Sequence, residues 1–512
     1  MPTSSENNKR IARNTLILYC RMFLMAAISL CTSRVVLQTL GVSDYGIYNA
    51  VGGFVAMFAL LSGMLTNSIN RFLAFELGKG DMDKLKRVFC TAVNVMALLS
   101  CLILVLGATA GVWFLNCAMN IPNGRTAAAN VVLACSVLTF IVNLVSVPYN
   151  ASIVAHEKMS AFAYISLAEA TAKLLIVYAI AIAPADRLMT YAVMLLAMQL
   201  LVRLLYGVYC RRHFEECAYH FAIDKPLLKE MTTFAGWNFI GAGAAIINVH
   251  GINVMMNLFF GVTVNAARGI ATQVNTVVWQ FVTNFMMAMN PQITKSYAQG
   301  DYRYMHSLVC RGAKFSFFLI LFFLVPLCLE AHQVLVLWLG IVPEYAVSFV
   351  RLTLVSSALN VLSGTLVTGL HASGRLKRYM LIVGSVEITN FPLTYVAFKM
   401  GCSPLASYYI YLGVYFILML LRLYLVKDLI HMKASLFVRK VYLRVLLVGI
   451  TASVVPLLVY MPQEETLFRL LSVCLVSFAS TAACVYLLGL DSDERALING
   501  YIKKKIRRDK KQ

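Results

Sequence analysis

The chain has 512 residues, of which 60% are hydrophobic and only 13% are charged, and its mean hydropathy is +0.75. This composition excludes a soluble globular protein. Apolar stretches of about 20 residues, long enough to cross a bilayer, recur along the whole sequence and indicate an all-α polytopic membrane protein. The net charge of +21 does not indicate nucleic-acid binding, because the basic residues gather in the short polar breaks between apolar stretches.

We expect about fourteen transmembrane helices, separated by short polar breaks. The N-terminal segment "MPTSSENNKRIARN" is polar and leads into a span of full length, which predicts that no signal peptide is removed. The expected spans are residues 14–40, 49–77, 88–116, 126–150, 160–183, 188–210, 234–260, 265–292, 311–339, 346–371, 379–399, 404–426, 441–461 and 467–490.

The sequence contains two related halves. The distance from Gly41 to Asp81 equals that from Gly261 to Asp301, and Cys90 matches Cys310 at the same offset. Each half would hold six spans, and this even number gives both halves the same orientation in the membrane. The expected domains are an N-terminal lobe (1–210), a cytosolic linker (211–233), a C-terminal lobe (234–426), two additional spans (427–490) and a basic tail (491–512).

No motif for nucleotide hydrolysis, metalloprotease or serine-hydrolase chemistry occurs, so the sequence favours a transporter over an enzyme and predicts no cofactor. Four possible zinc ligands, Cys210, His213, Cys217 and His220, would form a stripe on a helix. Ligands to one zinc must converge within roughly 2.3 Å of the metal. We therefore expect no metal site here, and no disulfides among the thirteen scattered cysteines.

Charged residues within the expected spans carry surplus positive charge. A central arginine costs roughly 2.5 to 3.5 kcal/mol to insert into a membrane, so this surplus favours an anionic ligand. The basic residues are Arg21, Arg34, Arg71, Lys173, Arg203, Arg268, Arg351 and Arg422, and the acidic residues are Glu76, Glu169, Glu330 and Glu387.

Several of these charges also have structural interpretations. Arg351 and Arg422 lie near span ends and could reach the interface with their long side chains. Glu169 and Lys173 are one helical turn apart and could neutralise each other. Glu387 has no basic residue one turn away, so Glu387, together with the Glu169–Lys173 pair, is a candidate for ion coupling.

The best candidates for a substrate site are Arg21 and Arg34, which lie well inside the first span, followed by Arg71 and Arg268. Neutral polar residues in the seventh and eighth spans could line the same wet cavity or simply join helices. These are Asn248, Asn253, Gln273 and Gln280.

The motifs "LGVSDYGIYNAVGGF" and "VLWLGIVPEYA", in a plan of fourteen spans and two lobes, resemble the polysaccharide-exporter branch of the multidrug/oligosaccharidyl-lipid/polysaccharide (MOP) superfamily. This resemblance implies a V-shaped, MATE-like fold with a cationic central cavity lined by spans 1, 2, 7 and 8. Spans 13 and 14 would form a groove for a lipid tail. Arg21, Arg34, Arg71 and Arg268 fall on the cavity spans.

The resemblance further implies a flippase for undecaprenyl-pyrophosphate-linked oligosaccharides in the bacterial inner membrane. Its partners would be the lipid-linked oligosaccharide, membrane lipids, and the polysaccharide polymerase and chain-length machinery. A multidrug or cation antiporter of the same superfamily remains the alternative, followed by a membrane enzyme acting on lipid-linked sugars. The basic interior and the two additional spans favour the flippase.

The basic breaks on one side, among them Lys84, Lys86 and Arg87, and the basic tail predict that both termini are cytoplasmic. Reporters fused after Gln512 and after Lys229 should therefore be active only in the cytoplasm, and a reporter after Pro462 only outside the membrane. Protease protection of the same fusions provides an independent measurement. An extracytoplasmic C-terminus would contradict both the even number of spans and the parallel repeat.

Overall fold

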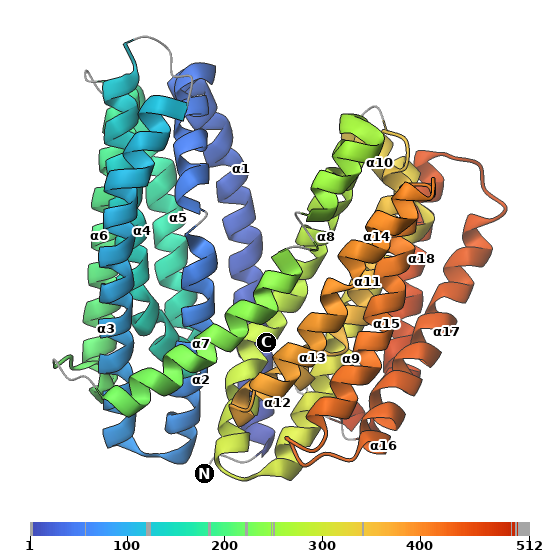
Figure 1. Cartoon of the computed structure of the whole chain (residues 1–512). Coiled ribbons are helices and arrows are strands. Elements are labelled where there is room, and N and C mark those ends of the chain that lie inside the picture. The colour runs from blue at the N-terminus through green and yellow to red at the C-terminus, as the bar shows by residue number, and fades with distance from the viewer. Residues whose placement is uncertain are drawn as a thin grey trace, which may run out of the picture. The chain divides into compact units, whose positions relative to one another are not determined.

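The computed structural model is helical throughout the residues that it describes, and no strand occurs among them (Figure 1). In hydrocarbon, a helix satisfies every backbone amide and carbonyl within its own segment, which explains why this sequence forms helices so uniformly. The described residues are 4–56, 58–118, 124–182, 186–220, 224–246, 248, 251–339, 342–492, 494–496 and 499.

The helices of the first part of the chain are α1 (Ser4–Ala56), α2 (Ala59–Lys79), α3 (Met82–Leu106), α4 (Thr126–Ala155), α5 (Met159–Ile182), α6 (Arg187–His213), α7 (Lys225–Ile246) and α8 (Ile252–Ala298). The later helices are α9 (Tyr302–Leu329), α10 (Ala331–Leu339), α11 (Ala346–Val361), α12 (Gly364–Ser373), α13 (Lys377–Ile388), α14 (Asn390–Lys399), α15 (Ala406–Val426), α16 (Ala434–Phe437), α17 (Leu443–Tyr460) and α18 (Leu467–Cys484). Short helical turns include η3 (Glu215–Cys217), η5 (Val438–Tyr442) and η6 (Val485–Gly489).

Eleven helical segments of the described chain are long and apolar enough to cross a membrane, so the chain is a multi-pass membrane protein. They coincide with eleven of the expected spans. The three expected spans without a counterpart among them are 49–77, 234–260 and 265–292. The number fourteen therefore stays a prediction.

Two expected breaks are helical instead. Residues 41–48 lie inside α1 and residues 261–264 lie inside α8. Both stretches begin with glycine but contain no proline. A glycine costs about 1 kcal/mol in a helix interior, whereas proline costs about 3 kcal/mol, so glycine alone does not end a helix.

The chain divides into two compact units. The first contains Met1–Phe239 and Met287–Asp301, and the second contains Ile240–Met286 and Tyr302–Gln512. The helix α8 contributes to both, since its last twelve residues belong to the first unit. The boundaries expected for the lobes, linker, additional spans and tail remain predictions.

The first unit is built on close helix packing. The helix α4 packs against α2, α3 and α6, and α1 packs against α5. Gly78 allows α2 to approach the end of α8, because a Cβ atom there would lie 2.8 Å from the Cα atom of Lys295. Gly107 similarly makes room for Val137 of α4. Small residues at such contacts let membrane helices pack by van der Waals attraction.

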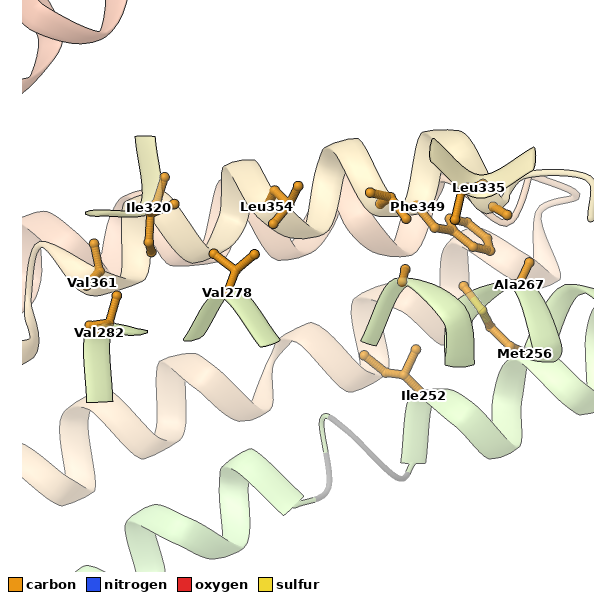
Figure 2. Packing of buried hydrophobic residues seen from close by; sticks show 14 of the residues in the cluster. Ile252, Met256, Ala267, Val278, Val282, Ile320, Leu335, Phe349, Leu354 and Val361 are labelled. Atoms are coloured by element: carbon orange, nitrogen blue, oxygen red, sulfur yellow. The ribbon is translucent and has the colours of Figure 1, made fainter. Parts of the chain in front are cut away.

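The second unit has a continuous apolar core (Figure 2). Val278 and Val282 of α8 lie beside Ile320 of α9 and Val361 of α11, while Phe349 of α11 packs near Leu335 of α10. The additional helices α17 and α18 pack against each other and against α9. This arrangement positions α9 between the core and the last two helices.

A buried carboxylate joins three parts of the first unit. Glu157, in the turn between α4 and α5, has no exposed side-chain surface. It forms ion pairs with Arg10 of α1 at 2.7 Å and Lys295 of α8 at 2.7 Å, and Gln292 of α8 donates a hydrogen bond to it at 2.6 Å. The backbone of Glu157 is held at φ 59°, a conformation uncommon for a side chain of this size.

We expect Glu157→Gln to destabilise the protein by about 3 kcal/mol, because the change leaves Arg10 and Lys295 without their counter-charge in a buried site. Thermal unfolding of the purified protein in detergent measures this effect. The neighbouring Lys158 is exposed, so Lys158→Gln is the matched control and should unfold as the wild type does. Equal unfolding temperatures for all three proteins would show that Glu157 does not stabilise the first unit.

Candidate functional site

Arg21 lies on α1 and faces α5. Its Nε donates a hydrogen bond to the Ser166 hydroxyl at 2.6 Å, and its guanidinium lies 4.5 Å from the centre of the Phe162 ring. The side chain is half-buried. One hydrogen bond and one cation–π contact leave several of its five N–H donors available.

The helix α5 presents a polar stripe beside Arg21. Phe162, Ser166, Glu169 and Lys173 are spaced at intervals of three and four residues, which places them on one helical face. Lys173 binds Glu169 at 2.7 Å, as the spacing predicts, and both side chains are partly exposed. The stripe therefore places two cations and one carboxylate side by side within the first unit.

Arg71 has a different environment. It is almost fully buried on α2 and lies 3.8 Å from Glu230 at the start of α7. Its guanidinium stacks over Phe72 at 4.4 Å and Phe234 at 5.3 Å. Arg71 is therefore already bound by a carboxylate and by aromatic rings of the protein itself. Arg34 lies in α1, but its side chain is outside the described residues.

In the second unit, Glu387 of α13 is the centre of a buried hydrogen-bond network. The Tyr415 hydroxyl of α15 donates to the Glu387 carboxylate at 2.7 Å. Asn248 donates to the Glu387 backbone carbonyl at 2.8 Å, and Asn390 donates to Asn248 at 3.1 Å. Asn248, which was expected in the seventh span, therefore binds the backbone of α13, the helix that carries the Glu387 carboxylate.

Arg268 of α8 lies beside an aromatic face of α15. Its guanidinium is 5.8 Å from the centre of the Tyr408 ring, and the side chain is half-buried. Tyr408, Tyr411 and Tyr415 follow at intervals of three and four residues, and the rings of Tyr411 and Tyr415 stack at 4.0 Å. Arg268 and Glu387 are thus both connected to α15, one through Tyr408 and the other through Tyr415.

The remaining neutral candidates differ in exposure. Gln273 and Gln280 are exposed on α8, whereas Asn253 is half-buried at its start. Gln273 and Gln280 are seven residues apart and share one helical face, whereas Asn253 lies 20 residues before Gln273, on the other side of a regular helix. They remain predicted site residues.

Three other intramembrane arginines are bound to the protein itself. Arg351 donates to the Cys328 carbonyl at 2.7 Å near the end of α9. Arg422 donates to the Asn360 side chain at 2.8 Å instead of extending freely to the interface. Arg203 stacks on Tyr149 at 3.9 Å. These contacts support structural roles.

The expected cysteine–histidine stripe does not form a continuous helical face, because α6 ends at His213 and Glu215–Cys217 form the separate turn η3. Cys210 and Cys217 are buried, and the Cys210 thiol donates to the Tyr149 carbonyl at 3.5 Å. His213 lies 2.9 Å from a carbonyl of its own helix. Over the described residues, no group of three or more metal-ligating side chains gathers in one place.

The structure adds residues that the sequence analysis did not select. They are Phe162 and Ser166 beside Arg21, and Asn390, Tyr408 and Tyr415 in the second unit. The regular spacing of the tyrosines was a usable signal. No sequence signal indicated the hydrogen bond between Tyr415 and Glu387, because tyrosine is common in membrane helices for other reasons.

Comparison with known proteins identifies the fold. No family model matches the sequence, and no curated protein matches it. Solved structures do match, and they are transporters of the MATE type. A MATE transporter in the straight conformation aligns with a TM-score of 0.68 and 13% identity, over 83% of this chain and 97% of that chain.

Two further matches belong to the MOP superfamily. An outward-facing multidrug resistance MATE transporter aligns with a TM-score of 0.65 and 13% identity, over 83% of this chain and 96% of its own. A transporter from Pyrococcus furiosus aligns with a TM-score of 0.64 and 13% identity, with the same coverage. The chain therefore has the MATE fold, at a sequence identity that establishes the fold alone.

We expect Tyr415→Phe to destabilise the second unit by about 1 to 3 kcal/mol, because the buried Glu387 carboxylate loses a donor and gains no replacement. Thermal unfolding in detergent measures the change. Tyr409 lies on the same helix but is exposed, so Tyr409→Phe is the matched control and should have little effect. Equal effects of the two substitutions would mean that the hydrogen bond to Glu387 contributes nothing.

Proposed function

We propose that this protein is a transporter that moves a lipid-linked oligosaccharide across the bacterial inner membrane by alternating access. The transported head group would carry a pyrophosphate, and both termini of the protein would lie in the cytoplasm. The polysaccharide polymerase and chain-length machinery would then act on the product. The MATE fold supports a transporter as opposed to an enzyme.

The observation that carries this proposal is the contrast between paired and unpaired cations. Lys314 and Arg469 are buried and Lys295 is 14% exposed, and each forms an ion pair with a carboxylate. Arg21 and Arg268 are half-buried on transmembrane helices, and neither forms an ion pair within the described part of the chain. Arg21 belongs to the first unit and Arg268 to the second, and Arg203, Arg351 and Arg422 are likewise half-buried without an ion pair in the described part of the chain.

Unpaired arginines suit a pyrophosphate. Guanidinium presents its N–H donors in a planar fork that matches phosphate oxygens, and it remains charged at all physiological pH values. A pyrophosphate with attached sugars is excluded from about 30 Å of hydrocarbon unless fixed donors replace its water. Exposed amide groups such as those of Gln273 and Gln280 would bind the sugars.

The matched structures are also compatible with an anionic substrate. For the transporter from Pyrococcus furiosus, reverse polarity of the binding pocket has been taken to suggest a different function. Pocket polarity thus varies among proteins with this fold. The surplus of basic over acidic residues within the spans of the present chain favours an anionic substrate.

Arg21→Gln and Arg268→Gln should each weaken binding of a polyprenyl-pyrophosphate oligosaccharide by roughly ten- to a hundred-fold, because each removes one or more charge-assisted hydrogen bonds. The measurements are the binding affinity of the purified protein and export of the glycan in cells that lack the native transporter. Membrane insertion should be unaffected, since a span inserts more easily without its arginine.

The matched control is Arg13→Gln. Arg13 lies on α1 about two turns before Arg21 and is exposed. It should bind substrate as the wild type does. Normal export by both the Arg21 and Arg268 variants, or equal loss in the Arg13 control, would exclude the cationic site.

A cation-coupled antiporter of the MATE type is a second candidate, and the environment of Glu387 favours it. The Glu387 carboxylate is almost fully buried, accepts a hydrogen bond from Tyr415, and has no ion pair within the described residues. A buried carboxylate of this kind can exchange a proton or a cation. One matched structure is a MATE transporter in complex with Rb⁺.

Glu387→Gln separates these two functions. If the protein exchanges cations, this variant should lose transport of a cationic dye driven by a proton or sodium gradient. If the protein is the flippase proposed above, the variant should keep binding the lipid-linked pyrophosphate, and the wild type should not transport the dye. Dye transport by the wild type that persists in the Glu387 variant would exclude Glu387 as the coupling site.

A further inference from the structure

The second unit contains a cavity of about 500 Å³ that the proposed function does not use. It lies where the first turns of α9 meet η5 and the segment after η6, so that the ends of three membrane helices surround it. Its lining is rich in cations. The lining residues are Arg303, His306, Ser307, Cys310, Arg311, Lys314, Leu436, Lys440, Asp491 and Ser492.

Some of these cations are neutralised by the protein. Lys314 is 1% exposed and binds Glu494 at 3.0 Å and Asp491 at 3.4 Å. Arg311 binds Glu494 at 3.2 Å. Partial burial acts to raise the pKa of Asp491. The nearby cations Lys314 and Arg444 outweigh this effect and hold that pKa below its ordinary value. Asp491 therefore remains ionised and forms part of the wall.

Arg303 and Lys440 provide the unpaired cations of the cavity, and His306 already has a partner. Arg303 and Lys440 are exposed and form no ion pair with any described carboxylate. The Nε2 atom of His306 lies 2.7 Å from the Ile430 carbonyl and must donate to it, because a carbonyl only accepts. Ser307 adds a hydroxyl. The positive end of the α9 dipole lies at the same place.

The positions of the first half that match two lining residues make contacts with the protein itself. At the offset of 220 residues, Ser307 and Lys314 correspond to Arg87 and Asn94 of α3. In the first unit, the segment after α6 covers these positions: Tyr219 donates to Asn94 at 2.8 Å and Asp224 pairs with Arg87 at 3.5 Å.

Apolar surface continues directly from the cavity. On α17, just after Lys440, exposed residues recur at intervals of three and four and form a stripe suited to lipid chains. The members of this stripe are Leu443, Leu446, Leu447, Ile450 and Val454. A ligand with a phosphate at one end and acyl chains at the other would fit both surfaces.

We propose that this cavity binds the phosphate group of an anionic phospholipid, with Arg303 and Lys440 as its principal ligands. The Ser307 hydroxyl adds a donor to the shell, while the acyl chains lie along α17. Basic pockets between membrane helices on the cytoplasmic side are suited to anionic head groups. This site uses none of the residues proposed to bind the transported head group, although α17 is one of the two helices expected to hold the lipid tail of that substrate.

The test measures lipids retained by the purified protein with native mass spectrometry, in detergent, with equal amounts of phosphatidylglycerol and phosphatidylcholine. The wild type should retain phosphatidylglycerol preferentially, and less of it as salt rises. Arg303→Gln and Lys440→Gln should each reduce retention roughly five-fold, since a basic residue near the surface contributes about 1 kcal/mol. The double variant should lose roughly twenty-fold or more.

Arg439→Gln is the matched control, because Arg439 is exposed beside Lys440 but does not line the cavity. It should retain lipid as the wild type does. Thermal unfolding without added lipid shows whether a variant has lost its fold, and both lining residues are exposed enough to tolerate glutamine.

A competition arm identifies the source of the phosphate. Inorganic phosphate and glycerol 3-phosphate at millimolar concentration should displace little lipid, because they lack the contact with α17. Complete displacement by either compound would reassign the cavity to a soluble phosphate. Equal retention of both lipids, unchanged retention in the double variant, or an equal loss in Arg439→Gln would overturn the proposal.

Discussion

The structure depends on one constraint: a charge removed from water must find a partner, and a membrane helix has few to offer. The protein meets this constraint with ion pairs that join distant segments. Arg469 of α18 binds Glu330 through two hydrogen bonds, at 2.8 and 3.1 Å. Glu157 similarly binds side chains from α1 and α8. Such pairs fix which helices lie together where apolar packing alone would permit alternatives.

The same constraint draws attention to the basic residues that have no carboxylate partner. Arg21 and Arg268 are held by an aromatic ring, and Arg21 also by a hydroxyl, which orient a guanidinium without neutralising it. Arg303 and Lys440 line the cavity in the second unit and are exposed. Positive charge is thus retained in two separate settings, one within transmembrane helices and one at their ends. Both settings favour phosphate-bearing ligands.

The two related halves that the sequence predicts differ in their polar chemistry. Glu169 of the first unit pairs with Lys173 on its own helix, whereas the corresponding Glu387 accepts from Tyr415 on another helix. The first unit covers the base of α3 with the segment after α6, and the second leaves the equivalent part of α9 open. The two carboxylates therefore have partners of different kinds, one charged and one neutral, so the two halves need not perform the same step.

The sequence by itself determined the class of protein, the helical fold and most helix positions; α15, for example, spans Ala406–Val426 where 404–426 was expected. Apolar run length is a local property, and a bilayer converts it directly into a helix. The Glu169–Lys173 ion pair could also be predicted, because its members lie one helical turn apart in the sequence. Only the tertiary structure decided the partners of Glu387 and Lys314, because Lys314 and Glu494 are 180 residues apart. No periodicity encodes such a contact, since it exists only after the helices have packed.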